Sequence, residues 1–471
     1  MQINPSFAKG IMTAPPSKSM AHRNLICAAL AQGKSVIHNI DFSADIEATI
    51  SCLNALGVKV QLDSPNTNEP ADTSLTVYGT GGKFTEASHS LFCNESGSTL
   101  RFFIPIAMLT NQEAIFTGSQ TLLSRPLSVY EDICSKQNIT FERLECSAEN
   151  KAKQTSQVNL TAKLSESTAS KQSYRQLKLH GKLQPGNFSI PGNISSQFIT
   201  GLLFALPLLD SDSTITLTDS IESRAYIDMT IQTQKNFGIK IEWQNENTLF
   251  ISGNQHYKAS EQIVEGDYSN AAFFEAFNYC TTTQCSQSSN SSSNSNSSNS
   301  SEKPVQIKGL NPQSLQGDKV YLTHFETLKK GFAEIDISDC PDLGPILFVI
   351  AALHHGAKFT GTKRLKIKES DRGSVMCEEF AKLGITTRQD ENEIVIWPLQ
   401  DRNAVPQSVT LLGHNDHRIV MALTVLLTKV GGCIEGVEAV RKSLPDFFKR
   451  IKKLGIDFEP NGEELKNGLD Y

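Results

Sequence analysis

Residues 53–60 read Leu-Asn-Ala-Leu-Gly-Val-Lys-Val, a short amphipathic run that ends in glycine and changes at once to alternating β-branched residues. Glycine or asparagine just past a helix end adopts a left-handed backbone conformation at little steric cost, so this pattern predicts a helix, a cap and a strand. The pattern recurs at 135–142, 234–243, 328–337, 380–387 and 451–459. Six such units, three in each half of the chain, predict an internally repeated α/β architecture.

A second pattern alternates with the first: small polar residues precede a long apolar run. These runs are 17–30, 94–109, 195–209, 267–277, 341–353 and 415–427. Several of them are apolar on every side, so we expect helices buried inside a domain rather than laid on its surface. Short strands such as 75–79 and 114–118 would form the outer walls. The predicted fold class is α/β, with sheets around central helices, formed twice.

Composition limits the classes of function. The chain has 471 residues, enough for two or three domains, and its 44 Lys and Arg against 50 Asp and Glu give a net charge of −6. This balance argues against a general binder of nucleic acid or anionic membranes. No apolar run approaches the ~20 residues of a membrane span, and residues 1–19 show no secretory signal, so a cytoplasmic location is expected.

The ten cysteines contain no Cys-x-x-Cys pair. We therefore expect buried thiols in a reducing compartment rather than disulfides or a metal site. Two polar stretches, 147–174 and the Ser/Asn-rich 285–301, are predicted to be a surface insertion and a disordered loop, respectively. Neither is expected to carry chemistry.

In the N-terminal half, polar groups gather where the apolar helices begin. Residues 16–23, Pro-Ser-Lys-Ser-Met-Ala-His-Arg, combine two hydroxyl groups and two cations with the N–H groups of a helix start, a combination that favours an anion. Residues 94–101 repeat the arrangement, with Gly97 allowing close approach to the backbone and Ser98 and Thr99 as candidate caps. Residues 195–197, Ser-Ser-Gln, open another helix. Simple capping explains these residues as well as ligand binding does.

In the C-terminal half, charged groups gather at predicted junctions between strands and helices, where α/β proteins place ligand-binding groups. They are Asp342, Lys368-Glu369-Ser370-Asp371-Arg372, Asn415-Asp416-His417-Arg418 and Lys442. Surface salt bridges are the alternative interpretation. For His417, a structural hydrogen bond is an alternative to catalysis.

Seven motifs then occur in one order across nearly the whole chain: SKSMAHR, ESGSTLR, SSQ, PD, KESDR, DHR and KSLPDF. Together they resemble the EPSP synthase family of enolpyruvyl transferases. The resemblance implies two inside-out α/β domains, residues 1–16 with 266–471 and residues 17–265, with the active site in the interdomain cleft. It also implies transfer of the enolpyruvyl group of phosphoenolpyruvate to the 5-hydroxyl of shikimate 3-phosphate by addition and elimination. No metal or organic cofactor is implied, and a monomer is expected.

Matching motifs imply the residue roles. The shikimate 3-phosphate set is Lys18, Ser19, Arg23, Ser195, Ser196, Gln197, Ser223, Asp342 and Lys368. The phosphoenolpyruvate set is Lys18, Gly97, Gln197, Arg372, Arg418 and Lys442. Asp342 is the candidate base for the hydroxyl, and Glu369, with Lys18, is the candidate for proton transfer at C3 of phosphoenolpyruvate.

One departure from the family pattern bears on donor binding. Thr121 stands where the family has an arginine after the Thr-Gly turn, while Arg125 matches a later arginine. The lost cation should weaken phosphoenolpyruvate binding unless Arg125 or another residue compensates. Two alternatives remain open: the sister family that uses UDP-N-acetylglucosamine as acceptor, and a catalytically dead member that acts as a scaffold through its Ser/Asn-rich segment.

Overall fold

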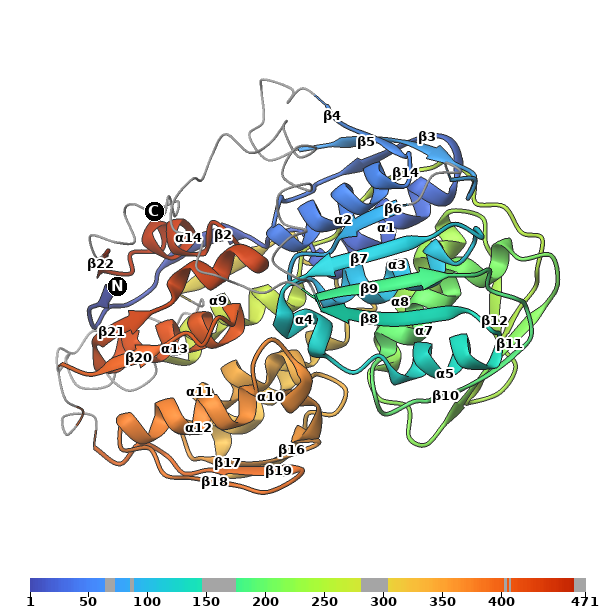
Figure 1. The fold of residues 1–471 in the computed structure, drawn as a ribbon. Helices are drawn as coiled ribbons and strands as arrows, with labels where there is room; N and C mark the ends of the chain where they lie inside the picture. The colour runs from blue at the N-terminus through green and yellow to red at the C-terminus, as the bar shows by residue number, and fades with distance from the viewer. Residues whose placement is uncertain are drawn as a thin grey trace. The chain divides into compact units, whose positions relative to one another are not determined.

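The computed structural model describes residues 1–63, 73–84, 89–145, 175–280, 304–401, 405 and 408–460, so the predicted insertions 147–174 and 285–301 lie outside it. The chain forms two compact units (Figure 1). Unit 1 comprises Met1–Lys18 and Glu265–Tyr471, and unit 2 comprises Ser19–Val264. The chain therefore leaves unit 1 after Lys18 and returns to it at Glu265.

Unit 2 contains three four-stranded sheets of one design, in which the first two strands are parallel and the other neighbours antiparallel. The first has the order β14 (Glu261–Ile263), β3 (Gln32–His38), β5 (Leu75–Thr80), β4 (Lys59–Leu62). The second has the order β6 (His89–Phe92), β7 (Ala114–Gly118), β9 (Arg175–His180), β8 (Thr140–Glu145). The third has the order β10 (Asn187–Pro191), β11 (Ser213–Thr218), β13 (Thr248–Ile251), β12 (Ile241–Trp243).

The core of unit 2 is helical. Its most buried helices are α1 (Lys18–Leu30), α3 (Gly97–Ala107) and α7 (Ser196–Ala205). Helices that are buried on one side only alternate with them along the chain: α2 (Ala44–Ala55), α5 (Ser128–Lys136) and α8 (Arg224–Asn236). Two short elements complete the unit, α4 (Gln120–Ser124) and the 3-10 helix η2 (Leu206–Leu208). Helix α7 packs against both α3 and α8, which brings the starts of separate apolar runs together.

Unit 1 repeats the design. One sheet has the order β16 (Ala333–Asp336), β17 (Ala357–Thr360), β19 (Glu393–Ile396), β18 (Thr387–Gln389). Another has the order β20 (Thr410–Leu412), β21 (Gly432–Glu435), β1 (Gln2–Ile3), β22 (Phe458–Glu459), and β15 (Val305–Lys308) pairs in parallel with β2 (Gly10–Thr13). The buried helices are α9 (Tyr268–Cys280), α11 (Gly344–Leu353) and α13 (His417–Val430). The amphipathic helices are α10 (Tyr321–Lys330), α12 (Arg372–Lys382) and α14 (Phe447–Lys453), and the 3-10 helices are η3 (Gly317–Val320), η4 (Pro341–Leu343), η5 (Thr362–Ile367) and η7 (Val437–Lys442). In Figure 1, α11 and α12 (orange) lie on one face of the β16–β19 sheet.

The predicted fold class is confirmed: sheets form the walls and apolar helices the interior of each unit. Five of the six predicted caps are left-handed, with φ between 55° at Asn138 and 89° at Gly455. The sixth, at Gly331, is wrong, because its φ of 171° is extended backbone that leads directly into β16. The predicted caps of α3 are also wrong, since the Ser96 side chain accepts the hydrogen bond from the Thr99 N–H.

Eight cysteines lie in the described residues; six are buried and no disulfide joins any two of them. The burial of these six agrees with the expectation for thiols, and Cys433, in strand β21, is partly buried. Within the described ranges, no helix combines the length and the apolar character needed to cross a membrane.

Candidate active site

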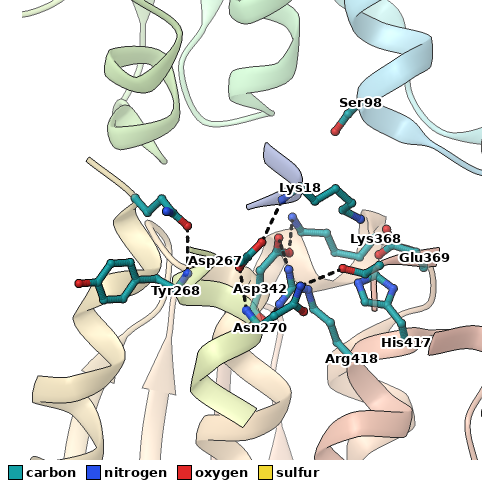
Figure 2. Close-up of polar contacts among 12 residues, drawn as sticks. Lys18, Ser98, Asp267, Tyr268, Asn270, Asp342, Lys368, Glu369, His417 and Arg418 are labelled. Carbon is teal, nitrogen blue, oxygen red and sulfur yellow. Dashed lines mark hydrogen bonds and ion pairs between the residues drawn. The ribbon is translucent and has the colours of Figure 1, made fainter. Parts of the chain in front are cut away.

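Asp342 lies at the centre of a cluster of charged side chains in unit 1. It occupies η4, directly before the buried helix α11. Its Oδ1 accepts hydrogen bonds from Lys368 Nζ at 3.0 Å and from Arg372 Nη1 at 2.8 Å, and its Oδ2 accepts one from Arg418 Nη2 at 3.2 Å (Figure 2). Three cations, two from residues 368–372 and one from the start of α13, therefore meet on one carboxylate.

These cations control the ionisation of Asp342. Burial would raise the pKa of this carboxyl, but Arg418, Lys368 and Arg372 outweigh burial and hold the pKa well below its usual range. Burial also lowers the pKa of Lys368, although the charge of Asp342 acts in the opposite direction. The Asp342 side chain is 25% exposed, so solvent screens part of these interactions. Asp342 is thus ionised at neutral pH and a weak base while all three cations contact it.

Arg372, the first residue of α12, is a buried cation with 1% of its side chain exposed. It donates from Nε to Asp416 at 2.8 Å and from Nη2 to Glu369 at 2.5 Å and to Asp416 at 3.2 Å. With the bond to Asp342, four of its five N–H groups are engaged, and the second N–H of Nη1 has no partner among the described residues. Burial opposes its charge, but the three carboxylates raise the pKa of Arg372 above its ordinary value.

The turn before α13 is held in an uncommon conformation. His414 and Asn415 are consecutive non-glycine residues with left-handed φ values of 48° and 52°. Glu379, a buried carboxylate on α12, fixes this turn, because its Oε1 lies 2.8 Å from His414 Nε2 and its Oε2 accepts the Leu412 N–H at 2.9 Å. Sequence analysis did not identify Glu379 as part of the supporting structure.

This turn links Lys442 to the charged cluster. Lys442, at the end of η7, donates from Nζ to the Asn415 carbonyl at 2.5 Å. The next residue, Asp416, is the N-cap of α13 and accepts the Arg418 N–H at 2.9 Å. The predicted residues Lys442 and Arg418 are therefore connected through the main chain of one turn.

His417, the first residue of α13, has no hydrogen bond to either ring nitrogen within the part of the chain that the structure describes. Its Nδ1 lies 3.9 Å from Asp416 Oδ1, which is too far for a hydrogen bond. The alternative of a structural hydrogen bond thus finds no support in the described residues. Burial lowers the pKa of His417 well below its usual value; Lys18, Arg418 and Arg372 lower it further, against the opposing charge of Glu369.

We predict that His417 makes the protein less stable in mild acid. The unfolded histidine binds a proton below about pH 6.5 while the buried one does not, so stability falls as pH falls, by up to about 1.4 kcal/mol per pH unit for this group. Urea unfolding at pH 7.5, 6.5 and 5.5 should show a shallower pH dependence for His417→Asn than for the unaltered chain. His355→Asn, at an exposed histidine, is the matched control. Equal slopes for the two variants would contradict a neutral His417.

Lys18 is the first residue of α1, and its main chain is bound within unit 1. The Lys18 N–H donates to Asp267 Oδ2 at 3.1 Å, and the Asn270 N–H donates to Asp267 Oδ1 at 2.8 Å (Figure 2). Asp267 is 4% exposed. Burial raises the pKa of Asp267, against these N–H groups and the charges of Arg418 and Lys18. One buried carboxylate therefore holds the starts of two helices.

In unit 2, Arg23 is a buried cation with neutral hydrogen-bond partners. It is 3% exposed and donates to the Ser19 carbonyl at 2.7 Å, the Tyr226 carbonyl at 3.0 Å and Thr230 Oγ1 at 2.9 Å. Burial lowers the pKa of Arg23 to about 10, against smaller opposing effects of Tyr226 and Cys27. Arg23 thus remains charged at neutral pH, in surroundings that favour an anion.

Gln197 joins the starts of α3 and α7. Its Oε1 accepts from Arg101 Nη1 at 2.8 Å, and its Nε2 donates to Ser98 Oγ at 3.0 Å. Ser195 Oγ accepts the Gln197 N–H at 3.3 Å, so Ser195 does cap α7. Its capping role and a role in binding can therefore coexist.

Two arginines beside Gly97 were absent from the predicted substrate sets, although sequence analysis named Arg125 as a possible substitute for the arginine missing at 121. A Cβ added at Gly97 would lie 2.9 Å from Arg125 Nη1 and 3.0 Å from Arg101 Nη1, so only glycine fits here without displacing them. Arg125 Nε is buried and has no hydrogen-bond partner among the described residues. Thr121 is exposed on α4. The signal for Arg125 was the Ser-Arg-Pro sequence at 124–126, which matched the later arginine of the family pattern.

The predicted site residues are distributed over the two units. Unit 1 holds Lys18, Asp342, Lys368, Glu369, Arg372, Arg418 and Lys442. Unit 2 holds Ser19, Arg23, Gly97, Ser195, Ser196, Gln197 and Ser223. Ser196 and Ser223 are buried, and Ser223 precedes α8 with a left-handed φ of 58°. Within the described ranges, no three His, Cys, Asp or Glu side chains are arranged to hold a metal ion.

Comparison with known proteins identifies the family of this chain. The family model described as EPSP synthase (3-phosphoshikimate 1-carboxyvinyltransferase) matches residues 4–173 and 166–451. Proteins named 3-phosphoshikimate 1-carboxyvinyltransferase from Clostridium novyi and Clostridium kluyveri are 37% and 34% identical; the matches cover 97% of this chain and 97% of the first, and 98% of this chain and 98% of the second.

Solved structures show the same fold. The EPSP synthase of Acinetobacter baumannii has a TM-score of 0.68 at 18% identity, covering 97% of this chain and 98% of that one. The enolpyruvyl transferase NikO of Streptomyces tendae has a TM-score of 0.63 at 12% identity, covering 97% of each chain. With the family model matched over most of its length, the chain belongs to the EPSP synthase family.

Proposed function

We propose that this chain transfers the enolpyruvyl group of phosphoenolpyruvate to the 5-hydroxyl of shikimate 3-phosphate and releases phosphate, a step of the shikimate pathway to chorismate and the aromatic amino acids. The single observation that supports this best is Asp342, a carboxylate contacted by Lys368, Arg372 and Arg418. It offers a proton acceptor beside cations that can neutralise anionic substrates.

The acceptor set is proposed to be Lys18, Ser19, Arg23, Ser195, Ser196, Gln197, Ser223, Asp342 and Lys368. Arg23 supports the assignment because it is a desolvated cation that has no carboxylate among its hydrogen-bond acceptors in the described part of the chain. A bound phosphate would supply the negative counter-charge that the neutral hydrogen-bond partners of Arg23 do not provide. Ser19 and Ser223 would add hydroxyl donors.

The donor set is proposed to be Lys18, Gly97, Gln197, Arg372, Arg418 and Lys442, to which we add Arg125. Arg372 has one N–H without a partner among the described residues, and the absence of a side chain at Gly97 lets Arg125 and Arg101 approach the start of α3. Arg125 supplies the positive charge that Thr121 lacks. The sequence departure at 121 would then not abolish donor binding.

The chemistry is addition followed by elimination. The 5-hydroxyl loses its proton to Asp342 and attacks C2 of phosphoenolpyruvate, while C3 gains a proton by way of Glu369 and Lys18. The tetrahedral intermediate then expels phosphate as C3 loses a proton. When the donor's anionic groups engage Arg418 and Arg372, these cations stabilise Asp342 less, and the pKa of Asp342 rises toward a value suited to proton transfer.

Arg125 provides a test of the donor set. We predict that Arg125→Met raises KM for phosphoenolpyruvate by about 10-fold or more, the usual effect of losing a charge-assisted hydrogen bond, while KM for shikimate 3-phosphate changes little. Steady-state kinetics with each substrate varied in turn will measure this. Thr121→Met, at an exposed position four residues earlier, is the matched control and should leave both constants near their original values. Equal effects of the two substitutions would contradict the assignment.

Phosphate release by the purified chain tests the proposed function, with each substrate omitted in turn and no metal added. Release that requires both phosphoenolpyruvate and shikimate 3-phosphate supports the reaction. Release only with UDP-N-acetylglucosamine would identify the sister reaction. No release with either acceptor would favour the dead scaffold.

The proposal also covers the domains, the oligomeric state and the location of the protein. We propose that the two enolpyruvyl-transferase domains are residues 1–16 with 266–471 and residues 17–265. The division into units 1 and 2, whose boundaries differ from these by one or two residues, supports this proposal. We expect a monomer that acts in the cytoplasm on small molecules, without nucleic acid, membrane, metal or organic cofactor.

A further inference from the structure

Gln316 lies where the chain leaves unit 1 and where it returns, although no sequence motif marked it. It is in the segment between β15 and η3, and it is 7% exposed. Its Oε1 accepts hydrogen bonds from the Tyr268 N–H at 3.0 Å and from Ser17 Oγ at 3.3 Å. Its Nε2 donates to Glu265 Oε1 and to the Gly266 carbonyl, both at 2.8 Å.

All hydrogen-bonding positions of this amide are therefore used. A glutamine amide has two N–H donors and two acceptor lone pairs, and each has a partner here. The carboxylate and the carbonyl face the nitrogen while the Tyr268 N–H faces the oxygen, so the reverse orientation of the amide would lose these three bonds. No other residue type supplies this set of bonds at this position.

The partners belong to the two segments of unit 1 that connect to unit 2. Ser17 is in the outgoing segment, residues 15–18, and Glu265, Gly266 and Tyr268 are in the returning segment, residues 265–268. The two segments also bond directly, because the Ser17 N–H donates to the Glu265 carbonyl at 2.8 Å and the Asp267 N–H donates to the Pro15 carbonyl at 2.7 Å. Gln316 thus bonds to both segments at once.

A second layer of bonds holds Glu265. Its Oε2 accepts from Asn311 Nδ2 at 2.8 Å, and its Oε1 accepts from Ser314 Oγ. Ser314 Oγ also accepts the Gln316 N–H at 3.1 Å. The loop 311–316 therefore fixes both the carboxylate and the amide that contacts it.

These contacts fix the main chain at Lys18. Its N–H bonds to Asp267, a member of the returning segment, and it directly follows Ser17, which Gln316 holds (Figure 2 shows the bond between Lys18 and Asp267). We propose that Gln316 is a positioning residue, which fixes the two connecting segments against each other and thereby holds Lys18 where it binds substrate. The role of Lys18 in this inference rests on the proposed function. The geometry of the two connecting segments is independent of that function.

The first test is amide hydrogen exchange of Gln316→Met, which keeps the length of the side chain but removes its four hydrogen bonds. Exchange at the Ser17 and Lys18 amides should accelerate by about tenfold or more, while the β16–β17 pair keeps its protection. Gln313→Met, the same change at an exposed glutamine of the same loop, is the matched control and should leave exchange unchanged. Unchanged exchange at Lys18 in Gln316→Met would overturn the proposal.

The second test is affinity for shikimate 3-phosphate, measured by titration calorimetry. Gln316→Met should weaken binding by about tenfold when Lys18 is present and by less than about twofold in a Lys18→Ala background, because the effect acts through Lys18. Equal losses in both backgrounds would indicate general structural damage and overturn the positioning role. If the unaltered chain does not bind shikimate 3-phosphate while exchange accelerates as expected, the proposed function fails and the positioning of Lys18 stands.

Substitutions that change the charge at positions 316 and 265 should give a pH dependence of substrate affinity that a purely structural role would not produce. Gln316→Glu places a second carboxylate against Glu265 and near Asp267, so affinity should fall as pH rises and the paired carboxyls ionise. Adding Glu265→Gln restores one amide and one carboxylate and should remove this pH dependence. Persistence of the pH dependence in the double variant would contradict the assigned contact.

Discussion

Replacing Asp342 with asparagine is expected to lower turnover by at least ~100-fold, the usual scale for loss of a general base. Asparagine keeps the shape of the side chain and one oxygen to accept from Arg372 or Lys368, but it cannot take the proton of the acceptor hydroxyl. Rapid-quench measurement of a single turnover isolates this chemical step from substrate binding and product release.

The affinity of the Asp342→Asn variant for shikimate 3-phosphate should change much less than its turnover. Asp339→Ala, at an exposed aspartate in the same turn, is the matched control and should remain near full activity. A single-turnover rate within threefold of the original would exclude Asp342 as the base and move attention to Glu369 or Lys18.

Replacing Arg372 with methionine is expected to lower the unfolding free energy of unit 1 by about 3–5 kcal/mol, because three carboxylates lose the cation they share. Arg372→Lys keeps the charge, but its three N–H groups cannot replace the four hydrogen bonds of the guanidinium, so it should recover only part of the loss. Both substitutions should also raise KM for phosphoenolpyruvate.

Fluorescence can report unfolding of unit 1 alone. The chain has two tryptophans, Trp243 in unit 2 and Trp397 in unit 1, so a Trp243→Phe background leaves Trp397 as the reporter during urea unfolding. Arg388→Met is the control, since Arg388 is 57% exposed and its ion pairs should contribute no more than about 1 kcal/mol. If Arg372→Met costs no more than Arg388→Met, the charged cluster does not stabilise unit 1.

Local sequence was sufficient to predict most of the fold. The change from an amphipathic run to a β-branched one depends on neighbouring residues, so the units at Gly57, Gly238 and Gly455 could be recognised without knowledge of their tertiary partners. Gly331 shows the limit of the argument. Glycine permits a left-handed cap but does not require one, and at Gly331 the chain continues in extended form instead.

The site was predictable where chemistry and motif coincide and not where support comes from distant segments. Asp342, Glu369 and Arg418 lie in short charged motifs at helix starts. Glu379 and Gln316 are ordinary residues in their local sequence, and their importance arises from contacts with His414 and with Ser17 that only the folded chain creates. The capping of α3 was misjudged by two or three residues because Ser96, Ser98 and Thr99 are all competent caps.

The pairing of β1 has a consequence for synthesis. Gln2 and Ile3 pair with residues 432–433 on one side and 458–459 on the other, whereas unit 2 is a continuous segment that ends at Val264. During translation, unit 2 can complete its core while the ribosome is still making the second half of the chain. Strand β1 must remain unpaired until its partner strands emerge, so unit 1 is assembled late. Pairing β1 with these strands closes a loop that contains nearly the whole polypeptide.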